Sequence, residues 1–566
     1  MTTKSLSVFT SALFLATAAT SFAAPPDAGQ LLREQQPQRQ IPQQLPKPDA
    51  EIEKPPLADT GVRITVKGFR FSGYQRLVKE SELQSLVADA VGKTFSFSEL
   101  QGLTNKITAY LKEQGWFLAR AYLPKQDVSA GLIEIAIIQG KSDGSLQIIR
   151  DKSVRLREET LRSMAKSVVS PGQPLSEKDL ERSVLLMNDL PGISARASLA
   201  PGATQGTTAV KIAASEGPLL SGGIWGDNQG NRYTGTWRGN GMLNINDPFS
   251  YGDQISLLLT GAEGLMQGRI GYSFPLTASG LKGSLSYTGM GYQLIGDLAP
   301  LQGEGQSHSI DAGISYPVIR TRTVNLNATA NYGFKALTDS YSNVTTSDRQ
   351  LNSGTIGING SIYDTALGGG YTTWNASVTT GSMHEGTANI AITGVEGAYS
   401  RFNIGASRLQ RLAERLSINL SYSGQFSLNN LDSSEKFNLG GPYGVRAYPV
   451  GEASGDEGHL FNIDLRYDLP LPASRGSAQV SGFYDAGQIT LQHSPWLNSI
   501  ATATNKNSYW LQGAGIGLNY VFSSRFNVRT SWAHTIGTND GRSTSGKDSD
   551  GRSDANRFWL QGTVWF

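Results

Sequence analysis

The sequence predicts a transmembrane β-barrel of 16 antiparallel strands, preceded by two soluble α+β units. Three observations predict this fold. From about residue 219 onward, apolar and polar side chains alternate in runs of about ten residues, the length that a tilted membrane strand needs. The number of these runs is even, as a bacterial barrel requires. The connections between them alternate between long and short, like the external loops and periplasmic turns of outer-membrane barrels.

The alternation is clearest in residues 416–428, LSINLSYSGQFSL. Its leucine, isoleucine, tyrosine and phenylalanine side chains share one face, because successive side chains of a strand point to opposite sides. Strands of soluble sandwiches are usually about 5–6 residues long, so these longer runs favour the barrel. We therefore assign residues 217–566 to the barrel. The expected strands are 219–228, 232–243, 253–262, 266–275, 281–292, 307–316, 323–334, 350–363, 370–382, 397–408, 414–427, 459–468, 476–487, 509–521, 525–536 and 556–566.

From the fifth strand onward, the length of each connection predicts the side of the membrane on which it lies. A soluble sandwich gives no reason for such an alternation. Long external loops are expected at 293–306, 335–349, 383–396, 428–458, 488–508 and 537–555. Short periplasmic turns are expected at 317–322, 364–369, 409–413, 469–475 and 522–524.

The first 23 residues have the composition of a signal peptide. Lys4 precedes the apolar run LFLATAA, and Ser21 and Ala23 are the small residues of a cleavage site after Ala23. The apolar run is too short for a membrane helix, and no other segment offers about 18 consecutive apolar residues. The chain also lacks cysteine, which suits an oxidising compartment. We therefore expect export from the cytoplasm.

Residues 24–61 are rich in proline and glutamine, which favours an extended chain. One piece, DAGQLLREQQ at 27–36, has the composition of a short helix that Pro37 ends. It is mostly polar and has almost no face to bury, so a disordered tail is an equal alternative from composition alone.

Two α+β units of similar element order follow. In the first, residues 62–141, strand patterns flank two helical patterns in the order β-α-α-β-β. Residues 142–216 repeat this order. Two consecutive units with one element order indicate an internal repeat.

The glycine-rich stretch GGPYGVRAYPVGEASGDEG at 440–458 lies in the longest connection. Its Arg446 is flanked by Val445, Ala447 and Tyr448, which an ordinary surface loop does not need. On the neighbouring strands, alternation places the side chains of Asp464, Phe483, Asp485 and Gly487 in the lumen. We expect the loop to fold inward so that Arg446 pairs with Asp485, while Val445 and Tyr448 pack near Phe483. The alternative is a solvent-exposed Arg446, whose ion pair would contribute only about 0–1 kcal/mol.

Three stretches resemble a known family. GVRAYPVGEASGDEG at 444–458 and GFYDAG at 482–487 look like the loop motif and the barrel-wall motif of two-partner secretion transporters, the TpsB or ShlB/FhaC/HecB haemolysin secretion/activation type. WGDNQGNRYTGTWR at 225–238 resembles the start of that family's barrel. The loop motif of this superfamily usually has glycine where this chain has Ala447. We therefore expect a negative φ at Ala447, because alanine at positive φ costs about 1 kcal/mol or more.

The resemblance implies an outer-membrane pore that exports one large partner protein, an adhesin, haemolysin, haem-acquisition protein or contact-dependent toxin. It implies that the two α+β units are POTRA domains in the periplasm and bind the unfolded partner. It also implies that the segment at about 27–36, with Leu31, Leu32 and Arg33, is a plug helix. A barrel-assembly insertase of the same superfamily and a passive porin are the alternatives.

Other functional classes find little support. The formal net charge of +2 gives no electrostatic basis for nucleic-acid binding. The sequence has no G-x-S-x-G or H-E-x-x-H motif, so we expect no enzyme activity, no cofactor and no bound metal. We expect a monomer that contacts outer-membrane lipid and lipopolysaccharide.

Overall fold

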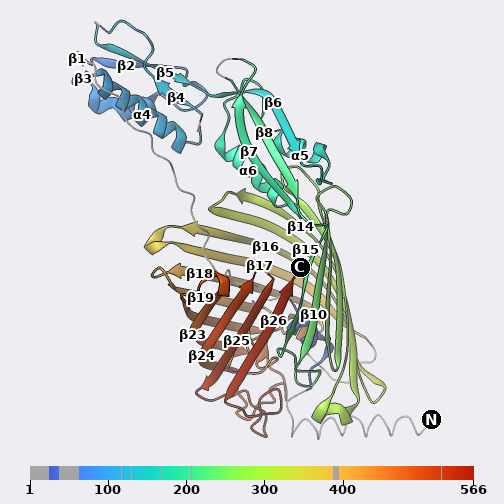
Figure 1. Cartoon of the computed structure of the whole chain (residues 1–566). Helices are drawn as coiled ribbons and strands as arrows, with labels where there is room; N and C mark the ends of the chain where they lie inside the picture. Colours follow the sequence, from blue (N-terminus) through green and yellow to red (C-terminus); the bar gives the residue numbers. More distant parts are fainter. Residues whose placement is uncertain are drawn as a thin grey trace.

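The computed structural model describes residues 25–36, 63–116, 118–128, 130–166, 169–204, 207–386, 394–523 and 525–566. The predicted signal peptide and nearly all of the predicted linker lie outside these residues. Two small α+β units are arranged one after the other at one end of a large barrel (Figure 1). The prediction of a 16-stranded antiparallel barrel preceded by α+β units is confirmed.

The first unit packs two helices on one face of a three-stranded sheet. The strand order is β2-β5-β4, with β2 parallel to β5. Alternate residues of the strands, such as Ile133 and Ile135, are buried against Leu83 and Ile107 of the helices. The elements are β1 (Arg63–Thr65), β2 (Gly68–Ser72), α3 (Glu80–Val87), β3 (Thr94–Ser96), α4 (Phe97–Glu113), β4 (Arg120–Tyr122) and β5 (Leu132–Ile138).

The second unit has the same design with its own core. Its sheet has the order β6-β8-β7, and Leu161, Met187 and Ile212 are buried between sheet and helices. The elements are β6 (Lys141–Arg150), α5 (Glu158–Ala165), α6 (Glu177–Asn188), β7 (Ile193–Pro201) and β8 (Thr207–Glu216). This is the predicted β-α-α-β-β order.

The second unit is bonded to the nearest turns of the barrel. Both carboxylate oxygens of Asp189 accept hydrogen bonds from Arg320, at 2.7 and 2.8 Å. Arg182 donates to the carbonyl of Pro317 at 2.6 Å, and Lys282 donates to the carbonyl of Asp189 at 2.6 Å. These contacts hold the unit at the end of the barrel that carries the short turns.

The barrel closes because its last strand, β26, pairs with its first, β9. Closure leaves no strand edge unpaired. The strands are β9 (Leu220–Asp227), β10 (Arg238–Asn246), β11 (Gln254–Ala262), β12 (Leu265–Pro275), β13 (Lys282–Gln293), β14 (Gly303–Arg320), β15 (Val324–Tyr341), β16 (Val344–Asp364), β17 (Gly370–Glu385), β18 (Gly397–Arg411), β19 (Leu416–Ser427), β22 (Glu457–Asp468), β23 (Ser477–Thr490), β24 (Ser508–Ser523), β25 (Phe526–Ile536) and β26 (Asn556–Trp565).

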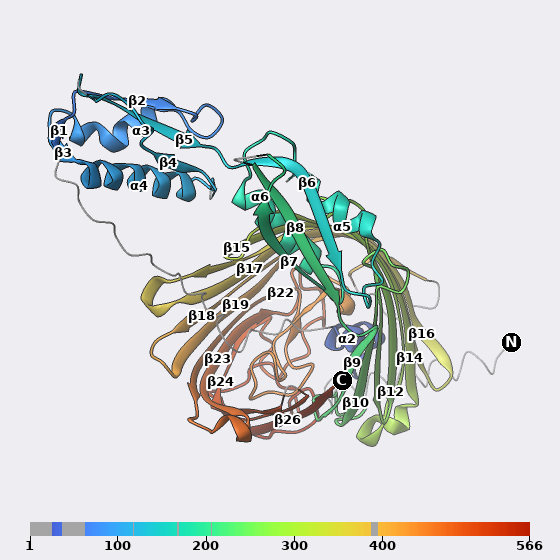
Figure 2. The same cartoon turned by 45° about the horizontal axis from the view of Figure 1, so that its top comes forward.

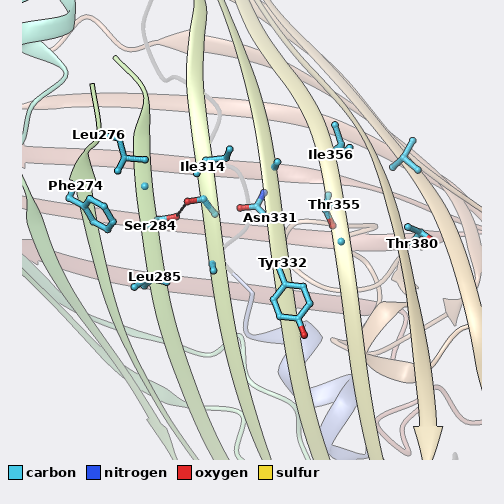
Figure 3. A pocket seen from close by; sticks show the side chains of 16 residues that line it. Phe274, Leu276, Ser284, Leu285, Ile314, Asn331, Tyr332, Thr355, Ile356 and Thr380 are labelled. Atoms are coloured by element: carbon cyan, nitrogen blue, oxygen red, sulfur yellow. Dashed lines mark hydrogen bonds between the residues drawn. The ribbon is translucent and has the colours of Figure 1, made fainter. Parts of the chain in front are cut away.

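The outer face of the barrel is apolar and exposed. A hollow of about 610 Å³ lies on this face across β12–β17 (Figure 3). Leu285, Ile314, Tyr332 and Ile356 border the hollow, and each is about half exposed or more. An apolar surface of this kind suits a hydrocarbon environment. None of the described helices is long and apolar enough to cross a membrane.

The prediction of an external loop at 335–349 is wrong. The strands β15 and β16 continue through it and leave only Ser342 and Asn343 between them. These two residues have φ values of 48° and 61°, as in the type I′ turn that suits a two-residue hairpin. The segment was expected to be a loop because its side chains are polar. Strands that extend beyond the membrane need no apolar face, so hydropathy alone does not detect them.

Candidate functional site: a plug helix and an inward loop in the lumen

The connection between β19 and β22, residues 428–456 and called loop 6 below, folds into the barrel. Its two arms pair as short strands β20 (Phe437–Asn438) and β21 (Ser454–Gly455). The tip turns sharply, since the Tyr448 amide donates to the Val445 carbonyl at 3.0 Å. Val445, Ala447 and Tyr448 are buried and share an apolar cluster with Phe483, as the sequence predicts.

Arg446 lies against the inner wall and contacts both predicted carboxylates. Its Nε and Nη2 atoms donate to the two oxygens of Asp485 at 2.8 and 2.6 Å, and its Nη1 donates to Asp464 at 2.8 Å. The guanidinium carbon also lies 3.4 Å from the centroid of the Phe483 ring. A two-point pair with a carboxylate and a cation–π contact each favour one fixed geometry. The alternative of a solvent-exposed Arg446 is therefore excluded.

Three residues that were not predicted as site residues complete the clamp: Trp559, Asn462 and Leu439. The Trp559 indole donates to the Arg446 carbonyl at 2.8 Å. Asn462 bridges the two sides, because its amide donates to the Gly444 carbonyl at 3.0 Å and to Asp485 at 2.8 Å. The space beside Gly487 is filled by Leu439 of loop 6, which lies 2.5 Å from where a Cβ atom would stand.

Ala447 has the predicted negative φ: it is not one of the non-glycine residues that have a positive φ in the described part of the chain. Its methyl group faces Gly513 of β24, and a Cβ atom at Gly513 would lie only 2.5 Å from it. The superfamily motif usually has glycine at the position of Ala447, and in this chain the extra methyl group is accommodated by Gly513 on the barrel wall.

The segment at 27–36 forms helix α2 (Ala28–Glu34), which lies inside the barrel (Figure 2). Asp27 caps its N-terminus by accepting a hydrogen bond from the Gln30 amide at 2.8 Å. The expectation that this helix has almost no face to bury is wrong, because Leu31 and Leu32 are buried. They join an apolar cluster that includes the inward-facing Leu337 and Leu351. Leu337 and Leu351 are apolar residues among the mostly polar residues that face the lumen. They could have indicated from the sequence that another apolar segment packs there.

Arg349 of β16 ties this helix to the barrel wall and to loop 6. It donates to Asp27 at 3.2 Å, to Asp339 at 2.7 Å and to Asp432 at 2.8 Å. Burial acts to raise the pKa of Asp27, but Arg349 and hydrogen bonds from Gln30 and Ser433 outweigh it and lower this pKa. Arg349 was not among the predicted site residues, because it lies in a segment expected to be a loop.

The helix contacts loop 6 along its length. The Ser433 hydroxyl donates to Asp27 at 2.9 Å, and Arg33 donates to the Lys436 carbonyl at 3.1 Å. At the C-terminal end, Glu34 accepts hydrogen bonds from Asn231 at 3.3 Å and lies beside Gly451. Burial raises the pKa of Glu34 to about 7. Helix α2 and loop 6 therefore form one packed unit in the lumen.

Comparisons with known proteins agree with this architecture. The family model for haemolysin secretion/activation protein ShlB/FhaC/HecB matches residues 206–520, and the model for the ShlB-type POTRA domain matches residues 64–140. Heme/hemopexin transporter protein HuxB of Haemophilus influenzae is 28% identical over 555 residues, which cover 94% of each chain. Outer membrane transporter CdiB of Dickeya dadantii is 24% identical over 481 residues, 81% of this chain and 82% of that relative.

Two solved structures are similar in fold. CdiB from Escherichia coli superposes with a TM-score of 0.71 at 21% identity, and the match covers 100% of this chain and 98% of that one. BamA from Haemophilus ducreyi, lacking its POTRA domains 1–3, gives a TM-score of 0.51 at 13% identity, over 89% of this chain and 100% of that one. The family model spans more than half of the 566 residues. The chain therefore belongs to the ShlB/FhaC/HecB family of haemolysin secretion/activation proteins.

Proposed function

We propose that this protein exports one large partner protein through the bacterial outer membrane and that α2 and loop 6 together close the pore at rest. The carrying observation is the position of α2. It lies in the lumen, bonded to the barrel through Arg349 and to loop 6 through Ser433 and Lys436. Membership of the secretion/activation family supports the export function, and the POTRA domains then lie in the periplasm.

The partner's class follows from the relatives. HuxB is named a heme/hemopexin transporter and matches this chain over 94% of its length. This favours a haem-acquisition protein over the other partners considered. The exporter acts as a passage without chemistry of its own, and the apolar outer face, with the hollow of Figure 3, contacts lipid.

The α+β units receive the partner before it enters the barrel. An extended polypeptide exposes unpaired backbone groups, and the sheets have open edges at β2 and β4 in the first unit and at β6 and β7 in the second. Backbone hydrogen bonds to such an edge are independent of side chains and suit an unfolded partner. The second unit is bonded to the barrel turns, so it delivers the chain directly to the lumen.

Deletion of residues 27–36 tests the closed resting state. We expect a several-fold higher conductance in a planar bilayer, because the lumen loses the helix that fills it. A deletion of equal length in the linker, residues 38–47, is the matched control and should conduct like the intact chain. Equal conductance of both deletions would contradict a plug, while secretion of the partner by the intact chain tests the export function separately.

A further inference from the structure

We propose that Arg466 and Arg529 form an anion-binding station in the lumen, which takes carboxylate groups of the polypeptide in transit. The proposal rests on the export function and specifies a chemistry for the passage. It concerns a cavity of about 460 Å³ beside the tip of loop 6, whose lining includes Arg446, Asp464, Arg466, Gln479, Asn519 and Arg529.

Strand register explains why the cavity exists. Arg466 of β22 is in line with Ser481 of β23, Gly517 of β24 and Ser531 of β25. These three small side chains leave the space into which the long arginine side chains extend. Arg529 lies two residues before Ser531 on β25, so both residues face the same side of the strand, and it pairs with Asn519 of β24. The two arginines therefore line one space from different strands.

Neither arginine is in direct contact with a carboxylate, although Asp464 and Asp468 lie near enough to Arg466 to attract its charge. Among the described residues, neither Arg466 nor Arg529 forms an ion pair or donates a side-chain hydrogen bond. The nearby carboxylates have other partners, since Asp464 accepts from Arg446 and Asp468 accepts from the Gln479 amide at 2.8 Å. Three other arginines of the lumen are paired with carboxylates, namely Arg238 with Asp227, Arg349 with Asp339, and Arg401 with Glu435, while Arg269 donates to the Ser286 hydroxyl.

Two unpaired guanidinium groups in a partly buried space select for a carboxylate. Arginine stays charged at all relevant pH values, so loss of a proton cannot relieve the repulsion that Arg466 experiences from Arg529 and Arg446, which Asp464 and Asp468 offset without a direct ion pair. An incoming carboxylate offsets this repulsion and accepts several charge-assisted hydrogen bonds. A lysine-rich or neutral segment gains nothing equivalent, so the station discriminates by charge.

The location favours a polypeptide on its way in. Arg466 lies two residues before the end of β22, and Arg529 lies three residues after the start of β25. Both strand ends adjoin short turns, on the side where the second α+β unit contacts the barrel. The station therefore lies between the delivering unit and the Arg446 clamp.

The test uses the full-length purified protein and a fluorescently labelled hexaglutamate peptide, followed by fluorescence anisotropy. We expect binding that Arg466→Gln/Arg529→Gln weakens about tenfold or more. Arg466→Lys/Arg529→Lys should retain part of the affinity because the charge remains. Arg525→Gln, which removes an exposed arginine from a short turn at the same end of the barrel, is the matched control and should bind like the intact chain.

Three results would overturn the station: equal binding by the double glutamine variant, equal binding of a hexalysine peptide, or full displacement of hexaglutamate by an equal concentration of inorganic phosphate. The last result would assign the cavity to small anions. Heat-modifiable gel mobility checks that each variant retains its barrel. Failure of the export function is a separate outcome, seen as absence of the secreted partner with the intact chain, whereas peptide binding concerns the station alone.

Discussion

At the scale of single residues, Arg446 fixes loop 6 to the barrel wall. It satisfies both oxygens of Asp485 and one of Asp464, and it stacks on Phe483. Removal of one partner from such a buried pair leaves an uncompensated charge, which costs about 3–5 kcal/mol. Removal of either Arg446 or Asp485 should therefore destabilise the docked loop 6 about as much as removal of both.

A double-mutant cycle tests this coupling. We expect Arg446→Ala and Asp485→Ala each to reduce secretion of the partner strongly, and the double variant to be little worse than either. The reason is that both single changes break the same interaction. The measurement is the amount of partner in the medium at equal levels of the transporter. Losses that add across the cycle would show that the two side chains act independently.

The contact between Ala447 and Gly513 gives a second prediction at this scale. Gly513→Ala should loosen the tip of loop 6, because the new methyl group would lie 2.5 Å from that of Ala447. Ala447→Gly alone should be tolerated, and the double variant should recover secretion relative to Gly513→Ala. Protection of loop 6 from a protease should follow the same order, with the weakest protection in Gly513→Ala and stronger protection in Ala447→Gly and in the double variant. No recovery in the double variant would argue against direct complementarity.

At the scale of elements, the attachment of α2 combines burial and charge. Burial of Leu31 and Leu32 contributes about 1.5–3 kcal/mol each. The capping Asp27 adds about 1 kcal/mol and is itself held by Arg349. Glu34 opposes these terms at neutral pH, because its burial disfavours the ionised form.

Glu34 therefore predicts a pH dependence of plug docking. The docked carboxyl has a pKa of about 7 and the released one about 4.5, so docking weakens as pH rises through this window and is constant above it. Asp27 has the opposite shift, and its contribution is lost only below about pH 4. We expect the open probability in planar bilayers to rise between pH 5 and pH 7.5.

Glu34→Gln should keep the low open probability of pH 5 at all these values. Glu452 of loop 6 also has a pKa raised to about 7, by burial and by Asp548, so Glu452→Gln is the control. The Glu452→Gln variant should still show the rise of open probability with pH that Glu34 causes. A full pH response in Glu34→Gln would assign the effect elsewhere.

The elements differ in how well the sequence predicts them. The existence of every barrel strand was predictable, because alternation over ten residues is a local signal that the membrane imposes. The second strand was expected at 232–243 and is found at Arg238–Asn246, because Asn231 and Tyr233 pack beside α2 in the lumen. The pairing of Arg446 with Asp485 was also predictable from the inward position of one and the unusual setting of the other. The Arg349 network was not, because it joins α2, β16 and loop 6, which lie far apart in the sequence. Polar strands beyond the membrane, as in 335–349, give no hydropathy signal.

At the scale of the whole molecule, the lumen is occupied by two segments that hold each other. Loop 6 is clamped to β22 and β23 at its tip, and its base holds α2. We therefore propose that passage of a polypeptide requires at least the release of α2. The periplasm lacks ATP, so the driving force that we expect is the folding of the partner outside the cell.

A disulfide between α2 and loop 6 tests this account most directly, because the chain has no cysteine of its own. The Asp27 and Ser433 side chains lie within hydrogen-bond distance, 2.9 Å apart, so Asp27→Cys/Ser433→Cys places two thiols side by side between α2 and loop 6. The measurement is secretion of the partner before and after reduction, with each single cysteine variant as control. We predict that the oxidised protein secretes almost nothing and that a reductant restores secretion. Normal secretion by the fully cross-linked protein would contradict the requirement that α2 leaves the lumen.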